Sequence, residues 1–128
     1  MADIIYKELS YKINGILFNT HNELGQFCNE KQYCDFIEQV LQKSNISYER
    51  EKVLAPLFAQ ESIGRNKVDF LIENKIILEV KAKRLTGNED YYQVKRYLAS
   101  SNKKLGILVN FRKKYITPKR IINSSASE

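Results

Sequence analysis

The sequence is short of the features that mark membrane and secreted proteins. No apolar run approaches the roughly 18 uninterrupted residues of a membrane-spanning helix. The first residues include Asp3, Lys7 and Glu8, where a secretory signal peptide would be apolar. We therefore expect a protein that works in the cytoplasm and does not insert into a membrane.

Cysteine and histidine are also scarce. The sequence has only two cysteines, Cys28 and Cys34, whereas disulfide-built domains of this size carry more. No CxxC pair is present to join the single histidine, His21, in a zinc site. We expect both thiols to be reduced and no structural zinc centre.

What is present indicates one ordinary globular domain. The chain has 128 residues, of which 43% are hydrophobic and 28% charged, which suits a single folded unit with its own core. We place this domain at residues 1–123 and expect the serine-rich tail, 124–128, to be frayed. The 21 basic residues exceed the 15 acidic ones, and the net charge of +6 favours a polyanionic partner such as nucleic acid.

Hydrophobic periodicity predicts alternating helices and strands. Apolar residues recur at helical spacing in three segments, and runs of alternating or continuous apolar residues predict strands in five others. The predicted helices are 4–24, 29–43 and 88–99, and the predicted strands are 46–57, 68–72, 76–82, 105–111 and 119–123. Pro56 favours an edge position or a strand end for the first strand. This order of helices and strands predicts an α/β fold with a mixed central sheet flanked by helices.

The most informative stretch is IILEVKAKR, in which charged residues interrupt an apolar strand. If the preceding turn is centred on Asn74, antiparallel pairing places Asp69 opposite Glu79. Directly opposed like charges destabilise a sheet, so a cation is needed to offset them. Lys81 projects on the same face as Glu79, because alternate strand residues share a face.

Two interpretations of this cluster follow from spacing alone. The three charges could form a salt-bridge ladder on the solvated face of an antiparallel sheet. Alternatively, the two carboxylates could bind Mg²⁺, which is usually held by one or two carboxylates with waters and phosphate oxygens. An amine beside such a metal can orient water or stabilise developing negative charge.

These residues resemble the signature of the PD-(D/E)XK nuclease superfamily, an Asp followed after a turn by (Asp/Glu)-x-Lys. Asp69 and the segment Glu79-Val80-Lys81 match this signature, and the order of helices and strands agrees with it. The chain is also similar to the GxxExxR family within that superfamily. The segments that carry this similarity are HNELGQFCNEKQY, VDFLIENKIILEVKA, YYQVKRYL and LGILVNF.

The resemblance implies a restriction-endonuclease-like fold and a site that includes Glu30 as an additional metal-binding carboxylate and Gln93 as a catalytic residue. It implies hydrolysis of DNA with Mg²⁺, for which Mn²⁺ can substitute; RNA as substrate would use the same chemistry. Asp69 and Glu79 would bind the metal, and Lys81 would act on the water. A nucleic-acid-binding or protein-interaction module that keeps the fold without hydrolysis is the alternative function.

Basic residues near the predicted site are candidates for contacts with nucleic acid. Those flanking it in sequence are Lys83, Arg84, Lys95 and Arg96. Such side chains neutralise backbone phosphates, although they also suit a solvated surface. A homodimer is compatible with cutting both strands of a duplex, because each strand needs an active site.

Overall fold

The computed structural model describes residues 4–126 and contains three helices and five strands. Their bounds are α1 (Lys7–Leu24), α2 (Glu30–Lys43), β1 (Tyr48–Val53), β2 (Lys67–Ile72), β3 (Ile76–Lys81), α3 (Asn88–Ser101), β4 (Leu105–Asn110) and β5 (Lys119–Ile122). No helix within the described residues is long and apolar enough to cross a membrane.

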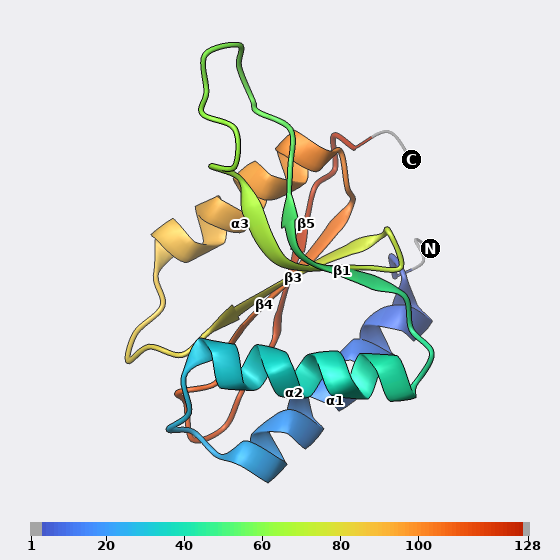
Figure 1. Ribbon diagram of the computed structural model, residues 1–128, viewed down its shortest axis with the longest axis vertical. Helices are drawn as coiled ribbons and strands as arrows, with labels where there is room; N and C mark the ends of the chain where they lie inside the picture. Colours follow the sequence, from blue (N-terminus) through green and yellow to red (C-terminus); the bar gives the residue numbers. More distant parts are fainter. Residues whose placement is uncertain (1–3, 127–128) are drawn as a thin grey trace.

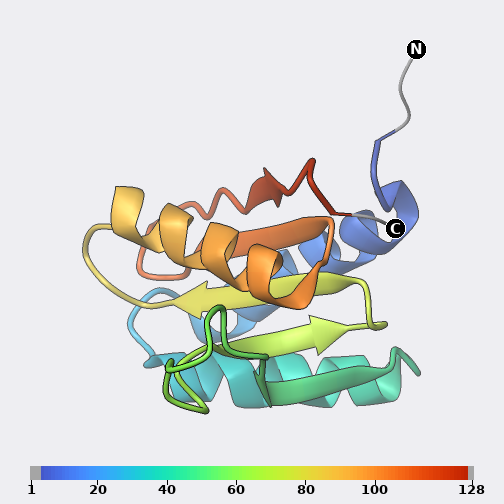
Figure 2. The same ribbon diagram turned by 90° about the horizontal axis from the view of Figure 1, so that it is seen from above.

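The strands form one mixed sheet, as the sequence predicts. Their order is β1-β2-β3-β4-β5, with β3 and β4 parallel and the other neighbours antiparallel. The helix α3 connects the two parallel strands, as such a crossover requires. Figures 1 and 2 show α1 and α2 on one face of the sheet and α3 on the other. The expected restriction-endonuclease-like α/β architecture is confirmed.

Each face of the sheet buries its own apolar cluster. Phe70, Ile72 and Leu78 lie in the larger cluster, beneath α1 and α2. Leu71 and Ile77 lie in the smaller cluster, against Val94, Tyr97 and Leu98 of α3. Successive residues of β2 and β3 therefore point to opposite faces of the sheet. Because helices cover both faces, these strands are apolar almost throughout.

Val68 departs from the predicted alternation. Its even number places it on the face of Phe70, but it is buried in the cluster beneath α3. The pairing of β1 with β2 is interrupted here, between the pairs Arg50–Phe70 and Lys52–Val68. Glu51, at the interruption, has a φ of 54°. The regular pleat of β2 is interrupted at Asp69, so Val68 and Phe70 point to opposite faces of the sheet although they are two residues apart.

Two predicted elements differ from the structure by more than two residues at one end, and the predicted tail lies partly outside the described residues. The first helix starts at Lys7 rather than at Ile4, after Tyr6 in a left-handed conformation with φ 50°. The predicted strand 46–57 is shortened to β1, because the chain leaves the sheet at Leu54 and Pro56 cannot donate to a ladder. The predicted tail, 124–128, extends beyond the described residues, which end with a turn in which the Ala126 N–H donates to the Asn123 carbonyl.

Gly106 allows α3 to lie close to the sheet. A Cβ atom at this position of β4 would be 2.6 Å from Cγ1 of Val94. That distance is far shorter than a normal contact between carbon atoms. Glycine in this strand is thus required by the close approach of the helix that carries Gln93.

We predict that Gly106→Ala lowers the free energy of unfolding by about 1–3 kcal/mol, the usual effect of overpacking a core. Combining it with Val94→Ala should cost less than the sum of the two single changes, since the clashing methyl group is then absent. Urea denaturation of the wild type, both single variants and the double variant measures this coupling. Additive losses would contradict the proposed contact.

Candidate active site

The two strands of the predicted site separate where its carboxylates begin. The backbone register of β2 and β3 continues as far as Phe70 and Leu78. One step further, Glu79 Oε1 accepts a hydrogen bond from the Asp69 N–H at 2.8 Å, and Asp69 Oδ2 accepts one from the Val80 N–H at 2.7 Å. Two carboxylates therefore cross between the strands and take the place of backbone carbonyl acceptors.

Glu79 is almost completely buried. Only 4% of its surface is exposed, near the end of a strand whose other residues, apart from Lys81, are apolar. Burial raises the pKa of its carboxyl group, and the nearby Asp69 carboxylate raises it as well, so that the pKa lies at about 8. An ionised Glu79 is thus costly without a cation beside it. A solvated salt-bridge ladder, one of the two interpretations of the sequence, does not fit this burial.

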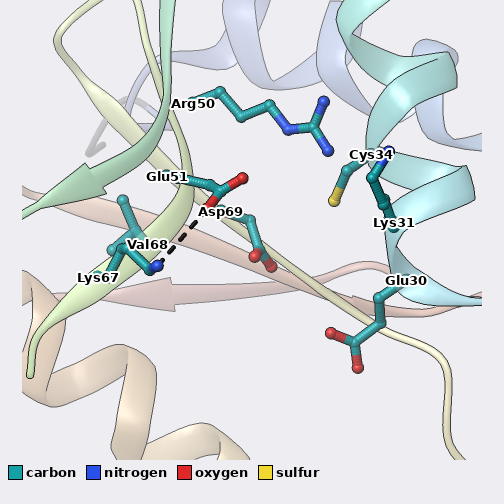
Figure 3. A pocket seen from close by; sticks show the side chains of 8 residues that line it. All are labelled: Glu30, Lys31, Cys34, Arg50, Glu51, Lys67, Val68 and Asp69. Carbon is teal, nitrogen blue, oxygen red and sulfur yellow. Dashed lines mark ion pairs between the residues drawn. The ribbon is translucent and has the colours of Figure 1, made fainter.

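Asp69 experiences a similar environment. Burial raises the pKa of its carboxyl group, the negative charge of Glu30 adds to this, and the hydrogen bond from the Val80 N–H opposes both. Figure 3 shows the carboxylates of Asp69 and Glu30 facing the same open space between β2 and the start of α2. Glu30 thus comes close enough to interact with Asp69, although the two residues are 39 positions apart in the sequence.

The N-terminus of α2 is held firmly in this position. Asn29 caps the helix through a reciprocal pair of bonds with Gln32, at 2.8 and 2.9 Å. Arg50 on β1 donates to Asp35 at 2.7 Å and to Glu38 at 2.8 Å, which fastens α2 to the sheet. These contacts fix the first residue of the helix, Glu30, beside the strand pair.

A cavity of about 300 Å³ opens beside Asp69, and its lining includes residues that the sequence did not single out. The eight lining residues, all labelled in Figure 3, are Glu30, Lys31, Cys34, Arg50, Glu51, Lys67, Val68 and Asp69. Burial raises the pKa of the Cys34 thiol and favours its neutral form. The carboxylate oxygens of the lining are the donors that suit a hard divalent cation.

Glu51 is the least expected member of this lining. It has a positive φ of 54° within β1 and forms an ion pair with Lys67 at 3.5 Å. Positive φ is uncommon for residues other than glycine, and nothing in the local sequence indicates it. Strained backbone of this kind often lies near functional sites.

Lys81 and Gln93 meet on the side of α3. The Lys81 ammonium donates to Gln93 Oε1 at 2.9 Å and lies 3.7 Å from Glu79 Oε2. The side chain of Lys81 is only 16% exposed. An ammonium group has three N–H donors, so the bond to Gln93 orients Lys81 and leaves donors for another ligand.

The four predicted nucleic-acid-binding residues differ in their surroundings. Lys83 donates to Asp90 at 2.7 Å, and Lys95 donates to the Ile122 carbonyl at 2.9 Å. Arg84 and Arg96 are exposed. Both arginines are accessible to solvent, and the Arg96 guanidinium also lies over the Tyr97 ring, 5.6 Å from its centroid. The two lysines form hydrogen bonds within the protein.

Asn110 is a supporting residue that the sequence analysis did not identify. Its side chain accepts from the Lys83 N–H at 3.1 Å and donates to the Lys83 carbonyl at 2.7 Å. It thereby holds the chain directly after Lys81, the last residue of β3. A polar residue at the end of the apolar strand LGILVN is the signal that could have revealed it.

Comparison with known proteins agrees with this geometry. The family profile of the PD-(D/E)XK nuclease superfamily matches residues 7–122, and the chain belongs to that superfamily. Among solved structures, the crystal structure of SSO0001 is similar, with a TM-score of 0.55 and 21% identity over 92% of this chain. The match covers 57% of the SSO0001 chain, so this chain spans little more than half of that protein. No curated protein matches the sequence.

The residues at the fork between β2 and β3 fit a divalent cation, which nucleases of this superfamily generally use. Within residues 4–126, no group of three His, Cys, Asp or Glu side chains forms a ready-made metal site. Asp69 and Glu79 nevertheless offer carboxylate oxygens, and their raised pKa values reflect burial and repulsion that a cation would offset. Mg²⁺ suits such an incomplete set, since it retains waters and takes phosphate oxygens as ligands.

We predict that Glu79→Gln stabilises the metal-free protein at alkaline pH. An unfolded Glu ionises near its usual value of 4.5, whereas folded Glu79 holds its proton up to about 8. The wild type therefore loses stability as pH rises between these values. Glutamine keeps the oxygen acceptor for the Asp69 N–H and has no charge to bury.

Urea denaturation in EDTA at about pH 5 and pH 8 measures this difference. Glu79→Gln should be more stable than the wild type by about 1–3 kcal/mol at the higher pH and nearly equal to it at the lower. Glu49→Gln, at an exposed position of β1, serves as a control and should follow the wild type at both pH values. If the free energies of unfolding of the wild type and Glu79→Gln changed equally with pH, the folded protein would not hold a buried, protonated Glu79.

Proposed function

We propose that the protein is a metal-dependent nuclease that hydrolyses DNA phosphodiester bonds, and that it belongs to the GxxExxR branch of its superfamily. The observation that carries this proposal is the burial of Glu79 beside a second carboxylate, Asp69, and an ammonium, Lys81. Such a cluster lowers stability without a bound cation. Ionisable groups with shifted pKa values, gathered at one place, are typical of catalytic sites.

In this proposal Asp69 and Glu79 bind the divalent cation, Mg²⁺ or Mn²⁺, and Glu30 supports it from the N-terminus of α2. The cation would offset the repulsion among these carboxylates, attract a phosphate group and stabilise the negative charge that develops during hydrolysis. A neutral protonated Glu79 must lose its proton before it binds a cation, so metal affinity should increase with pH up to about 8.

Lys81 acts on the reacting groups. The attacking water loses a proton as its oxygen forms a bond to phosphorus, the bond from phosphorus to the leaving oxygen breaks, and the leaving oxygen takes up a proton, so that one proton is released and one is consumed. The Lys81 ammonium, oriented by Gln93, donates hydrogen bonds to the water or to the phosphate oxygens and stabilises their charge. Gln93 thus positions Lys81 and can also contact the water as a neutral donor.

The DNA strand would lie across this end of the sheet, with Arg84 and Arg96 contacting its phosphates. Lys83 and Lys95 can add positive charge if their present partners are exchanged for phosphate. Cleavage of both strands of a duplex needs two active sites, which a homodimer would supply.

We expect Lys81→Ala to lower the rate of DNA cleavage at least about 100-fold, because it removes a donor that stabilises developing charge. Lys103→Ala is the matched control. Lys103 binds Asn74 at 3.1 Å, in the turn at the opposite end of β2 and β3. Rates with plasmid and with single-stranded DNA in Mg²⁺ and Mn²⁺ measure the effect. Equal rates for Lys81→Ala and Lys103→Ala would remove Lys81 from the mechanism.

Calorimetric titration with Mg²⁺ and Mn²⁺ tests the metal site itself. Binding to the wild type should be lost in Asp69→Ala and in Glu79→Ala. Glu49→Ala is the control, because Glu49 is an exposed carboxylate of the same sheet. An absence of both metal binding and cleavage, with or without DNA, would favour instead a binding module that has the nuclease fold.

A further inference from the structure

The segment between β1 and β2, residues 54–66, exposes an unusual amount of apolar surface. This segment, the β1–β2 loop, extends beyond the sheet in Figure 1. Leu57 is 43% exposed, Phe58 61% and Ile63 88%. Two antiparallel strands can be joined by far fewer residues, and clustered exposed apolar side chains often mark a binding surface.

The loop is held by its own hydrogen bonds. Glu61 Oε1 accepts from the Leu57 N–H at 2.7 Å and from the Asn66 amide at 2.9 Å. The Glu61 side chain is 4% exposed and Asn66 is 1% exposed, so these hydrogen bonds lie in the interior of the loop. Ser100 of α3 also donates to the Ala55 carbonyl. The exposed side chains are thus carried by an ordered loop.

A cavity of about 420 Å³ lies between this loop and Arg96 of α3. Its lining combines the apolar side chains of Leu57 and Phe58 with the side chains of Gln60, Arg65 and Arg96. The Glu61 carboxylate also lines the cavity. Its Oε1 accepts the hydrogen bonds within the loop, and its Oε2 lies 3.8 Å from Nε of Arg65. An aromatic ring, an amide and two guanidinium groups together suit a nucleotide, which has an aromatic base and an anionic phosphate.

The cavity lies close to the candidate active site. Arg96 is three residues after Gln93 on α3, so the two side chains are neighbours on the helix surface, about 4.5 Å apart along its axis. Gln93 itself contacts Lys81. The β1–β2 loop also leads directly into Lys67, two residues before Asp69. A strand bound at the active site would therefore pass this cavity.

We propose that the cavity between the β1–β2 loop and Arg96 binds an unpaired nucleotide, with its base stacked on Phe58 and its phosphate contacted by Arg65 and Arg96. The inference rests on the proposed function, since the nucleotide belongs to the strand that is cleaved. A base within a duplex cannot offer its face to a side chain, so the site selects single-stranded or frayed DNA. The two arginines and the neighbouring active site favour nucleic acid over a protein partner.

Fluorescence anisotropy in EDTA tests this proposal without hydrolysis. The wild type should bind a labelled single-stranded oligonucleotide about tenfold more tightly than the same sequence in a duplex. Phe58→Ala should remove most of this preference, since loss of one stacking contact weakens single-strand binding by about tenfold or more. Ile63→Ala is the control, because Ile63 is an exposed apolar residue of the same loop that does not line the cavity.

A single-stranded oligonucleotide that contains 2-aminopurine reports the stacking directly. Its fluorescence should fall on binding to the wild type and to Ile63→Ala, but not on binding to Phe58→Ala. Equal affinity for single strand and duplex, an unchanged preference in Phe58→Ala, or no binding to either DNA would overturn the proposal.

The outcomes separate this inference from the proposed hydrolysis. Single-strand binding that depends on Phe58, without cleavage in Mg²⁺, would support the nucleotide site and contradict the nuclease function. Cleavage in Mg²⁺ together with single-strand binding that does not depend on Phe58 would support the nuclease function and contradict the nucleotide site. Circular dichroism should show that all variants fold, since both mutated side chains are exposed.

Discussion

The reciprocal bonding of Asp69 and Glu79 across β2 and β3 is the interaction on which the candidate site depends. Each carboxylate accepts a backbone N–H of the facing strand, which fixes both groups between the strands. The same bonds bring two negative charges together in a largely buried place, and burial raises both pKa values. A compact metal-free state therefore keeps the proton on Glu79, and a cation can replace that proton.

The layers around this strand pair complete the site from two sides. The helix α2, fastened to β1 by Arg50, brings Glu30 beside Asp69. The helix α3 lies close to β4 because of Gly106 and brings Gln93 to Lys81. The helix α2 thus adds a carboxylate to the site, and α3 adds the amide that orients Lys81. The β1–β2 loop extends the α3 side with a cavity suited to an unpaired base.

Much of the fold follows from local patterns, but the surroundings of the charges do not. The β2–β3 register was predictable because the turn at Asn74 and the apolar alternation agree on it. The burial of Glu79 was not, since it depends on how a helix later in the chain covers the strand. Nothing in the local sequence indicated the positive φ of Glu51, and Leu57 was assigned to a strand because its segment alternates.

The most direct test is a ¹³C NMR titration of the Glu79 carboxyl group in the protein without metal, repeated with saturating Mg²⁺. We expect a pKa near 8 without metal, which falls to well below neutrality when Mg²⁺ binds. A value near the usual 4.5 that Mg²⁺ does not change would contradict the account, because Glu79 would then be neither a buried carboxyl nor a metal ligand.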